Sequence, residues 1–198
     1  MMSAMTRANT DTREHLLATA TGIILGKGFA AVGLAEILAA AGVPKGSFYH
    51  YFRSKEGFGV ELLQRYFALY DERLAAMLAP ENGPARDCLL AYFSGWQQCS
   101  AEDGRVPGCL VVKLAGEVAD LSEPMRAALA SGTARIVARL TDCLQRGQQE
   151  GSIAAGRDVA QLASGLYSLW LGSALRSKVQ QDAECQQHAH ALTLALLA

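Results

Sequence analysis

An all-α fold is predicted for this chain, and three observations of composition and pattern lead to that prediction. Alanine and leucine dominate a sequence that is 51% hydrophobic, runs of β-branched residues are scarce, and only 5 prolines interrupt the helical periodicity. The mean hydropathy of +0.12 is that of a globular protein rather than a disordered one. A chain of 198 residues is long enough for one large or two small hydrophobic cores.

Three helices are expected in the N-terminal part of the chain. Asp11 and Glu14 stand three positions apart ahead of a leucine pair, which is typical of a capping box, so a first helix is predicted from about residue 11 to residue 27. Gly28 ends that helix. Two short helices are expected next, over about residues 34–41 and 45–51.

The second of these short helices carries unusual side chains. Gly42 separates the pair, and the stretch from Phe48 to Phe52 holds four aromatic residues and one histidine. Two helices about one turn apart, the second rich in donors and flat rings, are typical of a helix-turn-helix domain that presents a helix to the DNA major groove. The alternative interpretation is that these aromatic residues form a tight turn that is packed in the hydrophobic core.

Longer helices are predicted in the rest of the chain. Ser54 with Glu56 starts a helix that runs to about Leu78, and the breaker cluster Pro80-Glu81-Asn82-Gly83-Pro84 marks a boundary after it. We assign residues 1–54 to an N-terminal helix-turn-helix domain and residues 55–198 to a C-terminal regulatory and dimerisation domain. The remaining helices are expected over about 85–100, from near Cys109, from Ser122-Glu123-Pro124 to near Gly147, and over about 157–179 and 183–196.

The helix expected over about 157–179 repeats small residues among leucines and a tryptophan. Its small residues are Ala163, Gly165, Ser168 and Gly172. An apolar helix with so many small residues, which let a neighbouring helix approach closely, is either wholly buried or part of a subunit interface. We favour the interface, because DNA-binding proteins of this kind read pseudo-palindromic sites as homodimers.

The charge distribution and the cysteine content limit the possible functions. Residues 1–60 hold six Lys/Arg against four Asp/Glu, a net +2, whereas residues 61–198 hold twelve against fifteen, a net −3. A modestly positive N-terminal part suits a module that faces phosphate. The five cysteines have no CxxC spacing, which argues against a disulfide framework and a zinc site.

No motif for a cofactor or a membrane is found. Phosphate loops, metal clusters and dinucleotide fingerprints are missing from the sequence, so no cofactor and no metal are expected. The start MMSAMTRANT lacks the apolar segment of a signal peptide. The most apolar later run, Val159 to Leu175, is shorter than the roughly 20 residues that a bilayer requires. We therefore expect a cytoplasmic protein with no membrane partner and with reduced thiols.

The stretch from Phe29 to Phe58 resembles the DNA-binding signature of TetR-type transcriptional repressors. That signature pairs a helix-turn-helix with the pattern Gly-Val-x-Lys-Gly-x-Phe/Leu-Tyr-x-Tyr-Phe-x-x-Lys. Gly33 departs from the family, which usually has a threonine that caps the second helix and contacts phosphate. Glycine is an acceptable N-cap, but it lacks the side-chain contact. The residues that match the pattern are Lys45, Gly46, Tyr49, Tyr51, Phe52 and Lys55.

The resemblance implies a double-stranded operator as partner. The tyrosine hydroxyls can bind phosphate, Lys45 can reach phosphate or a guanine edge, and Lys55 can hold a phosphate at a helix N-terminus. His50 either faces bases or is simply exposed. Phe48 and Phe52 are expected in the core. The predicted DNA-binding residues are Lys45, Gly46, Ser47, Tyr49, His50, Tyr51 and Lys55.

A second resemblance spans most of the chain and points to the NemR-type branch of the family. It is carried by the segment from Asp11 to Thr19, by Pro107-Gly108-Cys109-Leu110-Val111-Val112-Lys113-Leu114, by the segment from Glu117 to Glu123, and by Leu169-Trp170-Leu171-Gly172. Members of that branch sense electrophiles and oxidants through cysteine and are then released from DNA. The likeness implies Cys109 as the sensor, with Lys178 as a possible amine partner. A packed-core role for Cys109 and a solvent-directed Lys178 are the alternatives.

Local chemistry suits a reactive Cys109. Pro107-Gly108 favours a helix start there, so the sulfur would lie near the positive end of a helix dipole with Lys113 one turn along. Both effects lower a thiol pKa. Cys88 and Cys143 lie in apolar helical patterns and are expected to be inert, whereas Cys99 and Cys185 lie in polar surroundings.

Two other kinds of function compete with covalent sensing. One is a repressor whose apolar pocket binds a reversible small-molecule inducer. The other, an enzyme with a catalytic thiol, needs a base, and no histidine lies beside a cysteine in sequence. We therefore expect no enzymatic activity. The predicted pocket residues are Tyr92, Phe93, Trp96, Tyr167 and Trp170.

Overall fold

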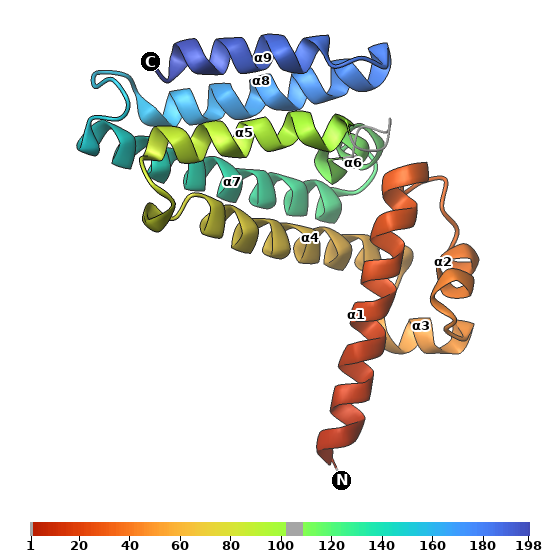
Figure 1. Ribbon diagram of the computed structural model, residues 1–198. Coiled ribbons are helices and arrows are strands. Elements are labelled where there is room, and N and C mark those ends of the chain that lie inside the picture. Colours follow the sequence, from red (N-terminus) through yellow and green to blue (C-terminus); the bar gives the residue numbers. More distant parts are fainter. Residues whose placement is uncertain (1, 102–108) are drawn as a thin grey trace. The chain divides into compact units, whose positions relative to one another are not determined.

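The computed structural model describes residues 2–101 and 109–198, and it describes the side chains of residues 12–96 and 109–198. Throughout these described residues the regular secondary structure is helical (Figure 1), so the predicted all-α class is confirmed. The elements are α1 Met2–Lys27, α2 Leu34–Ala41, α3 Lys45–Tyr51, α4 Lys55–Met77, a 3-10 turn Pro80–Asn82, α5 Ala85–Ala101, α6 Leu110–Val118, α7 Glu123–Glu150, α8 Val159–Gln180 and α9 Glu184–Leu196.

Most predicted helix boundaries agree with these bounds, and two caps are confirmed in detail. Ser54 caps α4, because its hydroxyl accepts from Gly57 N–H at 2.9 Å. Ser122 caps α7 in the same way, with Met125 N–H at 3.3 Å. The predicted start of the first helix near residue 11 is wrong, since α1 begins at Met2. The capping-box pattern at Asp11 and Glu14 does not mark the start of the helix, because the backbone is already helical before these residues.

The chain forms two compact units. The first holds the residues up to Phe67 together with Cys109–Ser131, and the second holds the rest. The first unit therefore contains α1, α2, α3 and α6 entire, the first part of α4 and the start of α7. Candidate DNA-binding residues and the candidate sensor thus lie in one unit.

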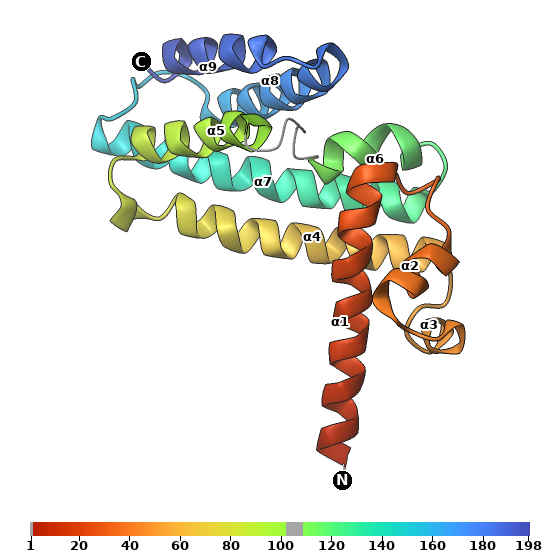
Figure 2. The same cartoon turned by 45° about the vertical axis from the view of Figure 1, so that its right-hand side comes forward.

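In the first unit, α2 and α3 lie beside α1 in both views (Figures 1 and 2). Their shared core contains Leu16, Leu17 and Ile24 of α1 and Ile37 of α2, all fully buried. His15 on α1 reaches the end of α2, where its Nε2 lies 3.1 Å from the Ala41 carbonyl oxygen. Burial of these aliphatic side chains stabilises the unit by about 1.5–3 kcal/mol for each side chain.

In the second unit, α5, α8 and α9 lie side by side (Figures 1 and 2). Phe93 and Trp170 stack at its centre, with ring centroids 5.3 Å apart and planes 13° apart. The buried indole N–H of Trp170 donates to Thr193 Oγ1 at 2.9 Å, and Thr193 donates to the Ala189 carbonyl at 2.7 Å. The two polar side chains are therefore paired within the core.

Helix α8 has two different faces. Ala163, Leu166 and Trp170 are buried in the unit. The opposite stripe carries the small residues Gly165, Ser168 and Gly172, and it continues at helical spacing into Leu175 and Val179. Leu175 and Val179 are 51% and 75% exposed, so the helix is not wholly buried within one chain. Contiguous exposed apolar side chains are, in general, typical of interaction surfaces on proteins.

None of the helices in the described ranges combines the length and the apolar character that crossing a bilayer requires.

Candidate nucleic-acid interface and thiol site

The turn between α2 and α3 follows from its sequence. Gly42 has φ +65°, the left-handed conformation that glycine adopts without strain. Its N–H donates to Ala39, and Val43 N–H donates to Leu38 at 3.0 Å, which closes the end of α2 as a Schellman motif. Pro44, extended at φ −61° and ψ 145°, then starts α3. The result is a helix-turn-helix.

Helix α3 is anchored by aromatic side chains on one side. Phe48 and Phe52 are buried, as predicted, and pack with Phe58 at the start of α4. The three ring centroids lie 4.8–5.5 Å apart. Such pairs add about 0.5–1.5 kcal/mol each beyond the area that they bury. A seven-residue helix, too short to be stable alone, is thereby held in one orientation.

The other side of α3 faces outward in the described chain. Tyr49 is 57% exposed. Lys45, Gly46 and His50 are also exposed, and Ser47 and Tyr51 are half-buried. The His50 and Tyr51 rings meet edge to face at 5.1 Å. All the α3 residues predicted to bind DNA therefore have surface from which to do so.

Lys55 extends this surface at the first residue of α4. It is half-buried, and its ammonium lies over the Phe29 ring, 5.0 Å from the centroid. A cation–π contact of this kind contributes about 0.5–1 kcal/mol at an exposed site and orients the side chain. The first amides of α4 point out of the same helix end, which is suited to a phosphate.

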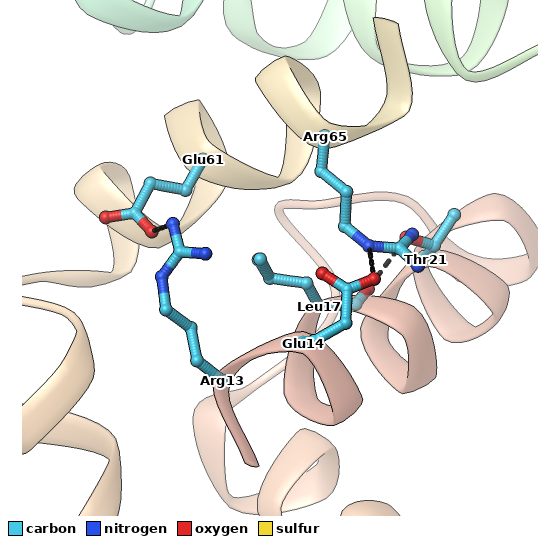
Figure 3. Close-up of polar contacts among 6 residues, drawn as sticks. All are labelled: Arg13, Glu14, Leu17, Thr21, Glu61 and Arg65. Carbon is cyan, nitrogen blue, oxygen red and sulfur yellow. Dashed lines mark hydrogen bonds and ion pairs between the residues drawn. The ribbon is translucent and has the colours of Figure 1, made fainter. Parts of the chain in front are cut away.

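Two ion pairs join α1 to α4 near the helix-turn-helix (Figure 3). Arg13 pairs with Glu61, and Glu14 pairs with Arg65. The Arg13 guanidinium also lies 5.9 Å from the centroid of the buried Phe52 ring. Because the cationic and anionic partners alternate between the helices, the pairs fix the register of α1 on α4. Exposed pairs contribute about 0–1 kcal/mol each, so their role here is orientation more than stability.

Cys109 lies at the N-cap of α6, where the sequence predicted a helix start. Pro107-Gly108, on which that prediction rested, lies outside the described residues. The thiol is half-buried, and its sulfur lies 3.9 Å from the Tyr66 hydroxyl on α4. Backbone N–H groups of Val111 and Val112 face the sulfur, as the geometry of a helix N-terminus requires.

The predicted lowering of the Cys109 pKa is wrong for this conformation. Burial raises the pKa of the thiol above its ordinary value of 9.0, and this outweighs the lowering by the two amides and the Tyr66 hydroxyl. Desolvation penalises a thiolate more than three weak hydrogen bonds stabilise it. Cys109 is therefore a protonated thiol at neutral pH, with donors already placed around the sulfur for the thiolate.

Three other thiols are packed more tightly. Cys88 and Cys143 are buried, as predicted, and burial raises the pKa of Cys143 despite Arg146 nearby. Cys185 was expected in polar surroundings, but it is buried, and its Sγ donates to Gln180 Oε1 at 2.7 Å. The side chain of Cys99 lies outside the described residues. Cys109 is thus the most accessible thiol in the described part of the chain.

Lys178 lies near the end of α8 and is half-buried. It belongs to the second compact unit, whereas Cys109 belongs to the first. Its pairing with the sulfur therefore stays a prediction.

The five aromatic residues predicted to line a pocket form one cluster in the second unit. Trp96 is half-buried, and its ring centroid lies 6.3 Å from Tyr92, 6.4 Å from Tyr167 and 6.1 Å from Trp170. Tyr92 and Tyr70 join their hydroxyls at 2.7 Å, and burial raises the pKa of Tyr92 well above its ordinary value. The rings pack on one another in this conformation, and a ligand site among them stays a prediction.

Glu117 on α6 makes a contact that the sequence does not predict. Its carboxylate accepts from the backbone N–H groups of Phe29 and Ala30, at 2.8 and 3.2 Å. The two partners are 88 and 87 residues away in sequence. No local pattern could have indicated this contact.

Two family models match the chain, and together they cover most of its length. The model of "Bacterial regulatory proteins, tetR family" matches residues 16–62, which hold the helix-turn-helix, and the model of "Tetracyclin repressor-like, C-terminal domain" matches residues 83–193. The chain therefore belongs to the TetR family of bacterial regulatory proteins.

The chain is similar in particular to the HTH-type transcriptional repressor NemR of Escherichia coli strain K12, at 45% identity over 179 residues, 90% of each chain. The transcriptional repressor DhaR of Mycobacterium sp. strain GP1 is 35% identical over 89% of this chain and 87% of its own. The crystal structure of the reduced form of E. coli NemR superposes with a TM-score of 0.91, at 44% identity, over 95% of this chain and 97% of that one. Both resemblances found in the sequence are thereby confirmed.

Proposed function

We propose that the protein is a transcriptional repressor that binds a pseudo-palindromic operator as a homodimer and is released when an electrophile or oxidant modifies Cys109. The observation that carries the proposal is the placement of two features in one compact unit. One is a rigid recognition helix with an exposed polar face, and the other is an accessible thiol at a helix N-terminus. The similarity to named repressors supports the first half of the proposal.

The DNA-binding half assigns different tasks to the exposed groups. Lys45 and His50 face the base edges or neighbouring phosphates, and Tyr49 and Tyr51 donate hydroxyls to phosphate. Lys55 holds a phosphate together with the first amides of α4. Contacts to phosphate set register and affinity, and contacts to base edges set sequence preference. Residues 1–54 would form the DNA-binding domain in the functional sense, and residues 55–198 the regulatory one.

Pairing of two chains would use the exposed stripe of α8 with the neighbouring face of α9, where Leu192 is 52% exposed. Apolar side chains and small residues together allow close approach of a second copy. A two-fold dimer presents two recognition helices to half-sites about one helical turn apart. Operator DNA lies in the cytoplasm of a bacterium, and we expect the protein to act there.

The sensing step is addition of the Cys109 thiolate to an electrophilic carbon. With a maleimide, the sulfur forms a bond to one alkene carbon, and the neighbouring carbon takes up a proton. The amides of Val111 and Val112 and the Tyr66 hydroxyl would stabilise the thiolate as it forms. The adduct is too large for a half-buried position, so α6 must shift. We infer that this shift changes the separation of the two recognition helices, which DNA tolerates poorly because half-site spacing is fixed.

A gel-shift assay on DNA from upstream of the protein's own gene tests the proposal. The untreated protein is expected to bind this DNA, and N-ethylmaleimide is expected to release it. Cys109→Ser is the critical variant, because it should bind as the wild type does and resist release. Cys88→Ser is the matched control and should be released normally. Full release of Cys109→Ser would move the sensor elsewhere.

A reversible inducer that binds among the aromatic residues of the second unit is the second candidate. The half-buried Trp96 ring favours it, because this ring is the accessible edge of an otherwise buried cluster. Two treatments after release of DNA distinguish the candidates. Dialysis restores DNA binding if the inducer is held without a bond, but not after covalent modification of a thiol. A reducing agent restores binding after oxidation of the thiol, and neither treatment restores it after alkylation.

A thiol enzyme is a third possibility that we do not favour. The named relatives are transcriptional regulators. Turnover in the presence of excess electrophile decides the matter, since a sensor consumes one equivalent for each reactive thiol and a catalyst consumes many.

A further inference from the structure

The first compact unit contains a carboxylate contact that joins the helix of the candidate sensor to the helix-turn-helix. Glu117 lies in the last turn of α6, eight residues after Cys109, which is about 12 Å along the helix. Its Oε2 accepts from Phe29 N–H at 2.8 Å and from Ala30 N–H at 3.2 Å, in the turn between α1 and α2.

The turn between α1 and α2 has room for this carboxylate because a glycine stands at position 28. Gly28 has φ +93°, a conformation that other residues adopt only with strain, and its N–H closes the end of α1 on Ile24 at 2.7 Å. A Cβ at this position would collide with the Glu117 carboxylate. The glycine therefore serves two purposes, because it ends the helix and it leaves the space that Glu117 occupies.

The Glu117 contact is electrostatically favourable only while the two N–H groups point at the carboxylate. Glu117 stands at the C-terminal end of α6 and faces the C-terminal end of α1, and both ends carry partial negative charge. The two backbone N–H groups offset that repulsion only while they point at the carboxylate. A small displacement of α6 thus converts a favourable contact into an unfavourable one.

Phe29 continues the connection to the candidate DNA-binding surface. Its backbone N–H binds Glu117, and its ring lies under the Lys55 ammonium, 5.0 Å from the centroid. Met125 at the start of α7 and the Phe29 ring both lie against Gly59, where an added Cβ would collide with each of them. Ser122 before α7 donates to Glu56 beside Lys55 at 2.6 Å. The segment between α6 and α7 therefore contacts the start of α4, which carries Lys55.

We propose that Glu117 is the positioning residue through which a change at Cys109 reaches the DNA-binding surface. In the unmodified protein its carboxylate holds the turn after α1, and through Phe29 it holds Lys55, in the arrangement that binds operator. Displacement of α6 by an adduct on Cys109 pulls the carboxylate from the two amides and frees the turn. This inference rests on the proposed function, since it requires that Cys109 is the sensor.

The test compares operator affinity before and after complete modification of the full-length dimer with N-ethylmaleimide. The ratio of the two Kd values measures coupling, and we expect about 10- to 100-fold for the wild type. Glu117→Ala should lower this ratio at least about fivefold, while mass spectrometry shows unchanged modification of Cys109. Glu117→Gln keeps one acceptor oxygen and should fall between. Glu123→Gln, an exposed carboxylate paired with Arg126, is the matched control and should keep the wild-type ratio.

Hydrogen exchange supplies a readout that does not depend on DNA. Modification of wild-type Cys109 should speed exchange of the Phe29 and Ala30 amides by about tenfold or more, and Glu117→Ala should show fast exchange there before modification. Glu117→Gln keeps the test open if the alanine variant fails to fold. If modified wild type still binds operator, the proposed function fails and this inference with it. If wild type and Glu117→Ala release DNA equally, or the two amides exchange at unchanged rates, only the role of Glu117 is overturned.

Discussion

Gly33 offers the sharpest test of the proposed DNA-binding surface, because a threonine there should improve two properties at once. Gly33 is the N-cap of α2, with φ −82° and ψ 152°, and its cap has no side-chain hydrogen bond. These angles suit any L-residue. A Cβ at this position meets nothing within 4 Å. The replacement therefore causes neither strain nor collision.

The stability gain from Gly33→Thr follows from two contributions. A threonine oxygen would accept a backbone N–H in the first turn of α2, which is worth a few tenths of a kcal/mol relative to glycine. Loss of glycine freedom in the unfolded chain adds about 0.4–1 kcal/mol. A total of about 1 kcal/mol corresponds to a rise in Tm of about 3 °C for a chain of this size.

The gain in DNA affinity would come from the hydroxyl. The family resemblance places this side chain against phosphate, and one added hydrogen bond of about 0.5–1.5 kcal/mol in each half-site strengthens operator binding by the dimer about 5- to 150-fold. The salt dependence should not change, because a neutral hydroxyl releases no counterion.

Gly33→Val is the matched control for both effects, because valine has the shape of threonine without the hydroxyl. Thermal melting should show that the threonine variant is about 1 kcal/mol more stable than the valine variant. Fluorescence anisotropy with labelled operator should show tighter binding by the threonine variant alone. Equal Tm values and equal affinities for the two variants would refute both the cap and the phosphate contact.

Three further experiments test the roles of Lys55, Cys109 and Phe48. Lys55→Ala should weaken binding at all DNA sequences alike and lower the salt slope by about 1 for each half-site, as measured by anisotropy across salt concentrations. Arg139→Ala in the second unit should do neither, and an altered base preference of Lys55→Ala would contradict the phosphate role. Maleimide should react with Cys109 more slowly than with free cysteine at pH 7, because burial raises the pKa of this thiol. The rate should still be rising at about pH 10, where the rate with free cysteine levels off, and a plateau at pH 9 or below would contradict burial of the thiol. Phe48→Ala should lower the free energy of unfolding by about 3–5 kcal/mol in a denaturant titration, and a loss below about 1 kcal/mol would show that α3 is anchored otherwise.

The structure could be predicted from the sequence where local chemistry decides it. The left-handed glycine at Gly42, the proline at the start of α3 and the aromatic run from Phe48 to Phe52 specify a turn and a buried face within about ten residues. Such features depend on backbone preference and on helical periodicity, which are both visible in the chain itself.

Properties that depend on distant residues were missed or misjudged. The local features of Cys109, a helix N-terminus and a nearby lysine, predicted a lowered pKa, but packing from elsewhere in the fold raises it. Cys185 lies in a polar stretch, yet helix packing buries it. The Glu117 contact with Phe29 joins segments 88 residues apart. Desolvation and long-range contacts are set by tertiary structure, which periodicity does not encode.

The central claim is that the state of one thiol decides whether the helix-turn-helix binds its operator. Titration of the dimer with N-ethylmaleimide, with operator affinity and the extent of adduct at each cysteine measured on the same samples, tests it most directly. We predict that the fraction of protein able to bind operator falls in proportion to adduct at Cys109 and is gone when that thiol is fully modified. Full operator binding by a protein whose Cys109 is completely alkylated would contradict the account.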